Sequence, residues 1–255
     1  MNVFLDRLRG RDPVLMLAIR SSRTADVVRI AKSTGHHAVM VDLEHSTMPL
    51  DVAASLCATA GDLGLFPFVR VRERDYGALG PLLDGGAQGI VAPRVETAEQ
   101  AATIARACRF APRGQRSQLA TVPLVGMRPT PAATLNPALD DATVVQVLIE
   151  TPAGVSSADE IAAVDGVDML AFGANDFTAE LGAPGRYTDH RVTEAVTVMA
   201  KACKRHGKPL MVGGIADQAL LRDLDSLGVC PLRLTGTDTD MLYAGAAARA
   251  ERFMK

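Results

Sequence analysis

The sequence contains no tryptophan, and aromatic residues make up only 4% of its 255 positions. Proteins that hold bare nucleobases stack them on such rings, so this scarcity disfavours single-stranded nucleic acid as a partner. The charge balance agrees, because 27 basic and 29 acidic residues leave a formal net charge of -2. Binding to phosphate backbones needs a basic surface instead. We therefore expect no nucleic-acid partner.

Cysteine and long apolar runs are also scarce. The four cysteines are Cys57, Cys108, Cys203 and Cys230. They lie far apart without a C-x-x-C pair, which excludes the usual zinc knuckle and a disulfide framework. No apolar run approaches the roughly 20 residues that span a bilayer. The first twelve residues mix charged and apolar side chains and hold no apolar signal core. These absences predict a reducing, cytoplasmic setting without membrane contact.

A regular series of eight short apolar segments is present instead. They span residues 14–20, 38–44, 66–72, 89–95, 144–150, 168–174, 209–215 and 230–236. Each has the length and continuous apolar character of a strand buried on both faces. Helix-like segments separate them, and Gly35 and Gly207 stand where helix C-caps are expected. The alternation predicts a single (β/α)8 TIM barrel over residues 1–255. An open sheet fits less well, because no G-x-G-x-x-G motif follows the first segment.

One connection, between residues 95 and 144, is longer than the others. A helical pattern opens it, and the remainder is rich in proline, glycine and serine. Long loops without structure are unusual in compact domains and commonly cover an active site or contact another subunit. We expect one of these two roles for this connection.

Polar residues follow the predicted strands at the end where such barrels keep their chemistry, because the βα loops converge there. These residues are Asp42, Glu44, His45, Arg70, Arg72, Glu150, Asn175, Asp176, Gly213, Gly214, Thr235, Thr237 and Asp238. All five lysines fall in helix-like segments or at the end of the chain. An imine mechanism needs a desolvated lysine in the barrel mouth, so we do not expect one. No G-x-S-x-G nucleophile elbow is present either.

Glu150 and Asp176, on neighbouring predicted strands, suit one hard divalent cation, which prefers oxygen ligands. The alternative, that each carboxylate pairs with an arginine, stays open. His45 is the one histidine just past a strand end, and it is either a catalytic base or a structural histidine. Asp42 is its expected orienting partner. Arg72 is interpreted as a solvated surface residue.

Five motifs occur in order along nearly the whole chain. They are VDLEHS (41–46), PFVRV (67–71), LLDGGAQGIVAP (82–93), LIET (148–151) and FGANDFT (172–178). Together they resemble the HpcH/HpaI family of metal-dependent, class II pyruvate aldolases. The resemblance implies a (β/α)8 barrel that assembles into homohexamers, as trimers of dimers, by exchanging a C-terminal helix.

The resemblance also implies roles for individual residues. Glu150 and Asp176 would bind a Mg²⁺, Mn²⁺ or Co²⁺ ion that also chelates pyruvate. Arg70 would contact the keto oxygen and hold the enolate. His45, oriented by Asp42, would manage the proton on the hydroxyl or aldehyde oxygen.

Further site residues follow from the same resemblance. Asp84 resembles the family's aspartate that reaches a neighbouring subunit's site. The expected substrate-binding positions are Arg70, Ala174, Asn175 and Gly213. The loop at residues 113–117 keeps the family's P-x-G-x-R shape and is expected to line the aldehyde side.

Two positions depart from the family pattern. Leu148 stands where the family usually has glutamine, two residues before the expected metal glutamate. Gln146 points to the same face of the strand but lies roughly 6.6 Å deeper, so it does not replace that glutamine. Leu43 replaces the commoner glycine of the D-G-E-H motif, which we interpret as neutral packing. The replacement of the family's glutamine by Leu148 is expected to affect which oxo acid the site accepts.

These expectations combine into one reaction and two alternatives. The chain would reversibly cleave a 4-hydroxy-2-oxo acid to an aldehyde and pyruvate or hydroxypyruvate. It could instead form a carbon–carbon bond, as in siderophore-type citrate synthases, or bind an oxo acid without turnover. A pure binder needs no base, so the joint presence of His45, Arg70 and the two carboxylates disfavours the last alternative.

Overall fold

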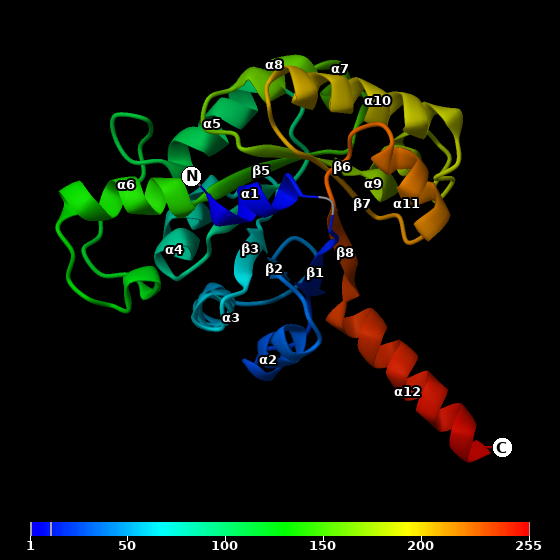
Figure 1. Cartoon of the computed structure of the whole chain (residues 1–255), viewed down its shortest axis with the longest axis horizontal. Helices are drawn as coiled ribbons and strands as arrows, with labels where there is room; N and C mark the ends of the chain where they lie inside the picture. Colours follow the sequence, from blue (N-terminus) through cyan, green and yellow to red (C-terminus); the bar gives the residue numbers. More distant parts are fainter. Residues whose placement is uncertain (1, 11, 255) are drawn as a thin grey trace.

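The computed structural model describes residues 2–10 and 12–254 and arranges eight parallel strands in one curled sheet (Figure 1). The strands are β1 (Val14–Ile19), β2 (Ala38–Asp42), β3 (Phe66–Arg70), β4 (Gly89–Ala92), β5 (Val144–Ile149), β6 (Met169–Gly173), β7 (Leu210–Gly213) and β8 (Leu232–Thr237). Each predicted apolar segment overlaps one of them. The segments are apolar throughout because both faces of a parallel barrel strand are covered.

The order of the strands makes the sheet a nearly closed (β/α)8 TIM barrel. It runs β7-β6-β5-β4-β3-β2-β1-β8, so β1 pairs with both β2 and β8. At the remaining seam the backbone N–H of Cys230, just before β8, donates to the carbonyl of Leu210 in β7 at 2.7 Å. The predicted fold class is confirmed. The register places Asp42 of β2 directly beside Arg70 of β3.

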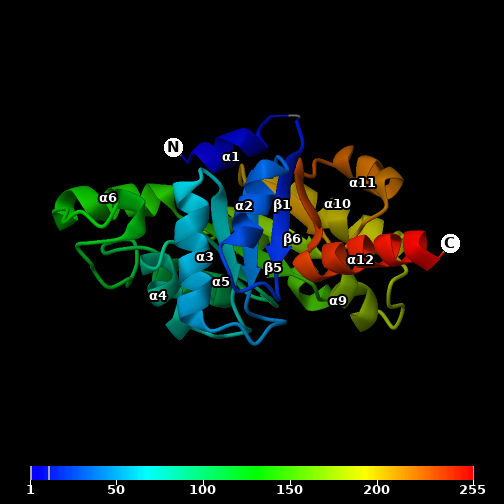
Figure 2. The same ribbon diagram turned by 90° about the horizontal axis from the view of Figure 1, so that it is seen from below.

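Helices surround the barrel (Figure 2). They are α1 (Val3–Leu8), α2 (Asp26–Ser33), α3 (Leu50–Asp62), α4 (Leu79–Asp84), α5 (Ala98–Cys108), α6 (Ala132–Ala142), α7 (Pro152–Ser156), α8 (Ala158–Ala163), α9 (Ala174–Glu180), α10 (His190–Arg205), α11 (Gln218–Asp225) and α12 (Asp238–Met254), with 3-10 turns η1 (Tyr76–Ala78) and η2 (Pro123–Val125). Gly35 and Gly207 follow α2 and α10 with φ of +83° and +65°. Both are therefore the predicted C-cap glycines.

Strand side chains alternate between two apolar cores, because successive residues point to opposite faces. Val39 and Val41 of β2 pack outward against the helices. Met40 of the same strand points inward, where it belongs to a core that fills the barrel with Phe68 and Met211. The apolar core inside the barrel stops short of the carboxyl ends of the strands. At those ends the side chains that point inward are polar.

The amino end of the barrel is closed by α1. The Phe4 ring stacks on Phe66 at 4.4 Å between centroids and meets Phe68 edge-on at 5.2 Å. The Asn2 side chain accepts hydrogen bonds from the N–H groups of Phe4 and Leu5, which caps this helix. The same side chain donates to the carbonyls of Asp141 and Ala142 at 2.9 Å, so the start of the chain is tied to the end of α6.

The long connection between β4 and β5 differs from the expectation of a structureless active-site cover. It contains α6, which packs through Leu135 and Leu139 on Phe110 and Val122 in a small core of its own. Tertiary packing stabilises this helix despite Pro137 in its interior. The last residues of α6 reach the amino end of the barrel, opposite the end that carries the chemistry. A role between subunits stays a prediction.

The last helix, α12, projects away from the barrel and buries none of its residues (Figures 1 and 2). Leu242, Tyr243 and Phe253 are 73%, 78% and 92% exposed on it. No helix within residues 2–10 and 12–254 is both long and apolar enough to cross a membrane.

Candidate functional site

A cavity of about 310 Å³ opens at the carboxyl end of the barrel. Its floor is apolar and includes Met40, Leu148 and Met211, whereas its upper wall carries charged side chains. The titratable residues of the lining are Asp42, His45, Arg70, Glu150 and Asp176, together with Arg20 and Asp240. Five of these seven were predicted. Arg20 ends the first apolar segment of the sequence, and that position is the signal that points to it.

Asp42 and Arg70 form a bidentate ion pair in the cavity. Arg70 donates from Nε and Nη2 to the two oxygens of the Asp42 carboxylate, at 2.9 and 2.7 Å. The Asp42 residue is only 2% exposed. Burial alone would lower the pKa of Arg70, but the hydrogen bond and charge of Asp42 outweigh it and raise this pKa. A bidentate pair of this kind holds the guanidinium in one orientation. Its Nη1 lies 3.1 Å from Oε2 of Glu44.

The structure does not show the expected contact between Asp42 and the His45 ring. Asp42 Oδ1 accepts hydrogen bonds from the backbone N–H groups of Glu44 and His45, at 3.1 and 3.3 Å. Its two oxygens also accept the hydrogen bonds from Arg70. The ring is instead 3.9 Å from Glu44 through Nε2, and its side chain is 55% exposed. Asp42 therefore positions Arg70 and the backbone after β2.

Glu150 is a second buried carboxylate of the site, with 3% of the residue exposed. Burial raises its pKa to about 7, and the negative charges of Asp176 and Glu44 add to this shift. Its Oε1 accepts the backbone N–H of Arg94 at 3.0 Å. A Cβ at residue 173 would lie 2.7 Å from Oε2 of Glu150, so Gly173 leaves the carboxylate its room.

Arg94 has a backbone conformation that is uncommon for a residue other than glycine, with φ of +50°. This conformation accompanies the hydrogen bond from its N–H to Glu150. Its guanidinium is directed elsewhere and pairs with Glu180 at 2.9 Å. No sequence pattern marked Arg94, because its contribution comes from the main chain.

The donor set fits a divalent cation. Glu150 and Asp176 line the same cavity, and the negative charge of Asp176 helps to raise the pKa of Glu150. A hard cation between two such carboxylates would relieve this repulsion and would bind oxygen ligands of the type it prefers. Within the described residues no group of three or more His, Cys, Asp or Glu side chains converges to hold a metal. Substrate or water oxygens would have to complete the coordination.

The predicted substrate-binding positions also lie in this cavity. Ala174 is buried at the start of α9, and Gly213 ends β7. The Asn175 Oδ1 accepts a hydrogen bond from the Tyr187 hydroxyl at 2.5 Å, which holds the amide against the cavity wall. Sequence reasoning had not singled out Tyr187, because it lies in a loop twelve residues further along the chain.

Asp84 is the predicted site residue that does not line this cavity. It ends α4, and its Oδ1 accepts a hydrogen bond from Nη2 of Arg116 at 2.8 Å. Arg116 is buried over the Phe110 ring, 4.6 Å from its centroid. Arg116 of the loop at 113–117 therefore faces Asp84 rather than the cavity of its own chain. The contact of Asp84 with a neighbouring subunit stays a prediction.

Comparisons with known proteins find aldolases among the chain's relatives. A 4-hydroxy-4-methyl-2-oxoglutarate aldolase of Hapsidospora irregularis is 39% identical over 237 residues, which are 90% of this chain and 86% of that protein. A hydroxypyruvate/pyruvate aldolase of Delftia acidovorans is 30% identical, over 99% of this chain and 92% of that protein.

Solved structures are similar too. The crystal structure of an HpcH/HpaI aldolase from Desulfitobacterium hafniense superposes with a TM-score of 0.90 at 25% identity, over 100% of this chain and 97% of that one. The citrate synthase SbnG gives a TM-score of 0.84 at 25% identity, over 98% and 96% of the two chains. The family model described as HpcH/HpaI aldolase/citrate lyase matches residues 16–219, and the chain therefore belongs to this family.

Proposed function

We propose that this chain is a divalent-metal-dependent aldolase that reversibly cleaves a 4-hydroxy-2-oxo acid to an aldehyde and pyruvate or hydroxypyruvate. The observation that carries the proposal is the charge arrangement of one cavity. A buried carboxylate, Glu150, lies near a like-charged Asp176. Beside them stands an arginine whose orientation is set by a bidentate contact with Asp42. The names of the similar aldolases support the same reaction.

Glu150 and Asp176 would hold the Mg²⁺, Mn²⁺ or Co²⁺ ion. When bound, such a cation polarises the keto oxygen of the substrate and stabilises negative charge on it. The Arg70 guanidinium supplies a second positive charge in the same cavity. Because Asp42 already holds it in place, it does not need to reorganise as the enolate charge develops.

His45 would act as the base. In the cleavage direction it takes the proton of the substrate's 4-hydroxyl group, directly or through a water. The bond between carbons 3 and 4 then breaks, carbon 4 leaves as the aldehyde, and the electron pair passes to the enolate at carbon 3. Proton return to carbon 3 gives the oxo acid. An exposed imidazole with 55% of its side chain accessible is free to approach a substrate oxygen.

Ala174, Asn175 and Gly213 would form the wall for the substrate's carboxylate end, because all three line the cavity. Leu148 makes the adjoining floor apolar. An apolar side chain there cannot donate or accept a hydrogen bond to a hydroxyl on the donor. We infer that pyruvate is a better donor than hydroxypyruvate.

The test is pyruvate release from 4-hydroxy-2-oxo acids after treatment with EDTA and after adding back Mg²⁺, Mn²⁺ or Co²⁺. The acids include 4-hydroxy-4-methyl-2-oxoglutarate, whose carbon 4 would leave as a second pyruvate instead of an aldehyde. We expect cleavage that disappears with EDTA and returns with at least one ion. Undiminished cleavage in EDTA, or no cleavage of any such acid with any ion, would refute the proposal. The reverse reaction with a panel of aldehydes identifies the partner substrate.

A second reaction is favoured by the structural similarity to a citrate synthase. In that case the cavity would join an oxo acid to a different enolate. Incubation with oxaloacetate and acetyl-CoA in the presence of EDTA distinguishes the two. Citrate formation under these conditions, together with no pyruvate release, would favour the synthase.

We also propose that the protein is a homo-oligomer, a hexamer built as a trimer of dimers, in which α12 is exchanged between subunits. The support is that α12 leaves its own barrel and carries Leu242, Tyr243 and Phe253 uncovered. In such an assembly Asp84 would reach the neighbouring site. Light scattering coupled to gel filtration gives the mass, and truncation before Leu242 should lower it.

A cytoplasmic location is part of the same proposal. All four cysteines are free and buried, which is typical of a protein kept under reducing conditions. Burial raises the pKa of the Cys57 thiol to about 12, which makes this side chain unreactive.

A further inference from the structure

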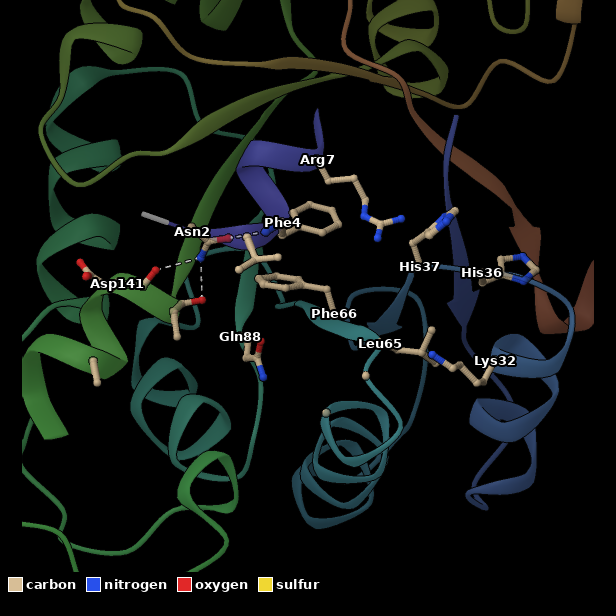
Figure 3. Close-up of a pocket in the computed structure, with 15 residues that line it drawn as sticks. Asn2, Phe4, Arg7, Lys32, His36, His37, Leu65, Phe66, Gln88 and Asp141 are labelled. Atoms are coloured by element: carbon tan, nitrogen blue, oxygen red, sulfur yellow. Dashed lines mark hydrogen bonds between the residues drawn. The ribbon is translucent and has the colours of Figure 1, made fainter. Parts of the chain in front are cut away.

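A second cavity, of about 520 Å³, lies at the amino end of the barrel (Figure 3). Residues from α1, α2, α6 and the segments that lead into β2, β3 and β4 line it. It shares no lining residue with the cavity at the carboxyl end. Strand β2 separates the two, with His37 just before its start and Asp42 at its end. At about 3.3 Å per residue these positions are roughly 16 Å apart.

One side of this cavity is positively charged. In Figure 3 the Arg7 guanidinium points toward His37, with His36 beside it, and Lys32 lies on the same side of the cavity with its amino group directed toward Leu65. Asp141 is the carboxylate in the lining and lies on the other side. Among residues 2–10 and 12–254, no aspartate or glutamate forms an ion pair with Arg7 or Lys32. Their charges are therefore left without a neighbouring counter-charge.

The pKa of His37 reflects the positive charges around it. Its pKa is lowered first by burial, and then by the charges of Arg7, His36 and Lys32. Its Nδ1 accepts the backbone N–H of Leu15 at 3.1 Å, so the ring proton of the neutral imidazole is on Nε2.

The histidine next to it is already used in the fold. His36 contacts the Thr235 hydroxyl through Nε2 at 2.9 Å and the carbonyl of Ala31 through Nδ1 at 3.2 Å. Within the described residues, Nε2 of His37 and the side-chain nitrogens of Arg7 and Lys32 make no such hydrogen bond. A phenyl ring adjoins them, because Phe66 also lines the cavity.

We propose that this cavity is a second binding site, for a small organic anion whose carboxylate or phosphate group contacts Arg7 and His37, with the charge of Lys32 adding to the attraction, while its apolar part lies on Phe66. The chemistry requires no metal and no turnover. A guanidinium and an ammonium group in a half-enclosed cavity are suited to either anion, and an anion there would replace the repulsion between the cations by attraction. The ligand would be a different molecule from the substrates at the carboxyl end.

Calorimetric titration with two probes tests the site and its preference. Benzoate has the carboxylate and the ring, and phenyl phosphate has the same ring with a dianionic group. The double variant Arg7→Gln/Lys32→Gln is compared with Lys201→Gln/Arg222→Gln, which removes the same charge from exposed positions on α10 and α11. We expect saturable binding of at least one probe that weakens tenfold or more in the first variant only.

Equal binding by both variants, or no saturable binding by the unaltered protein of either probe, would overturn the proposal. The ratio of the two affinities then identifies which anion class fits. Neither readout uses turnover, so failure here is independent of the aldolase assignment.

The ring of His37 supplies a second measurement. Its proton resonances are followed against pH by NMR, and His37→Gln identifies the signals. A bound probe should raise the titration midpoint, because an anion favours the charged imidazole. Arg7→Gln/Lys32→Gln should also raise it without a probe, since both removed charges lower the pKa of His37. A midpoint that the probe does not move would contradict direct contact with His37.

Discussion

The two ends of the barrel carry opposite charges and hold them in different ways. At the carboxyl end, Asp42 and Arg70 are locked together, and Glu150 is held by the N–H of Arg94. At the amino end, Arg7 and Lys32 make no ion pair within the described part of the chain. Fixed groups lower the reorganisation that a developing charge requires, whereas cations without an ion-pair partner gain one when an anion binds. Reaction is thus expected at one end and binding at the other.

The largest effect is expected from the carboxylates at the carboxyl end. Glu150→Gln and Asp176→Asn each remove a charge that would hold the cation, so kcat/KM for pyruvate release should fall about a thousandfold or more. Glu160→Gln, an exposed change on α8, is the matched control and should keep full activity. Full activity in Glu150→Gln would show that Glu150 is not a ligand of the cation.

Arg70→Ala should have the next largest effect, with kcat lowered about a hundredfold or more and KM changed much less. The reason is that its charge stabilises the enolate more than the bound substrate. Asp42→Asn keeps Arg70 but weakens the contact that orients its guanidinium, so kcat should fall about tenfold. Steady-state kinetics at saturating metal measures both. A change in KM alone would contradict the assignment of Arg70 as the group that stabilises the enolate.

The buried charge of Glu150 should also affect stability. Its pKa in the folded protein is raised to about 7, so folding favours the protonated carboxyl. The free energy of unfolding of the metal-free protein should therefore fall as the pH rises from about 4.5 to about 7. Glu150→Gln removes this dependence and should be more stable at pH 8 by on the order of 2 kcal/mol, but not at pH 4.

Urea denaturation of the EDTA-treated protein at the two pH values tests this prediction. Adding Mn²⁺ at pH 8 should stabilise the unaltered protein and leave Glu150→Gln unchanged, because a ligand stabilises only the state that binds it. If the variant were less stable at both pH values, the carboxylate would contribute to folding in a way that its burial does not explain.

The smallest effect on catalysis is expected from the amino end. Arg7→Gln/Lys32→Gln changes exposed side chains on the opposite side of the barrel, so kcat and KM without added anion should stay within about twofold. A large loss of activity would mean that the two ends are coupled through β2 or its neighbours. In that case the cavities at the two ends of the barrel would not be independent sites.

Many site residues at the carboxyl end of the barrel could be predicted, because their positions follow from the local sequence pattern. A parallel strand covered on both faces is continuously apolar, so a charged residue after such a strand lies at its end, as Glu150 and Asp176 do. The resemblance to the family added roles for them. The helix α6 was missed, because its proline and polar residues are typical of a loop and only packing on Phe110 and Val122 accounts for it.

Local pattern was sufficient for the eight strands, for the C-cap glycines and for the acidic residues of the mouth, since each depends on neighbours a few positions away. Which partners these side chains choose depends on segments that meet only after folding. Asp42 binds Arg70, 28 residues on, rather than the ring of His45. Glu150 takes an N–H from a residue 56 positions earlier. The cavity at the amino end likewise exists only because α1, α2 and α6 come together there. Contacts of this range are set by how the whole chain packs, and no short stretch of residues encodes them.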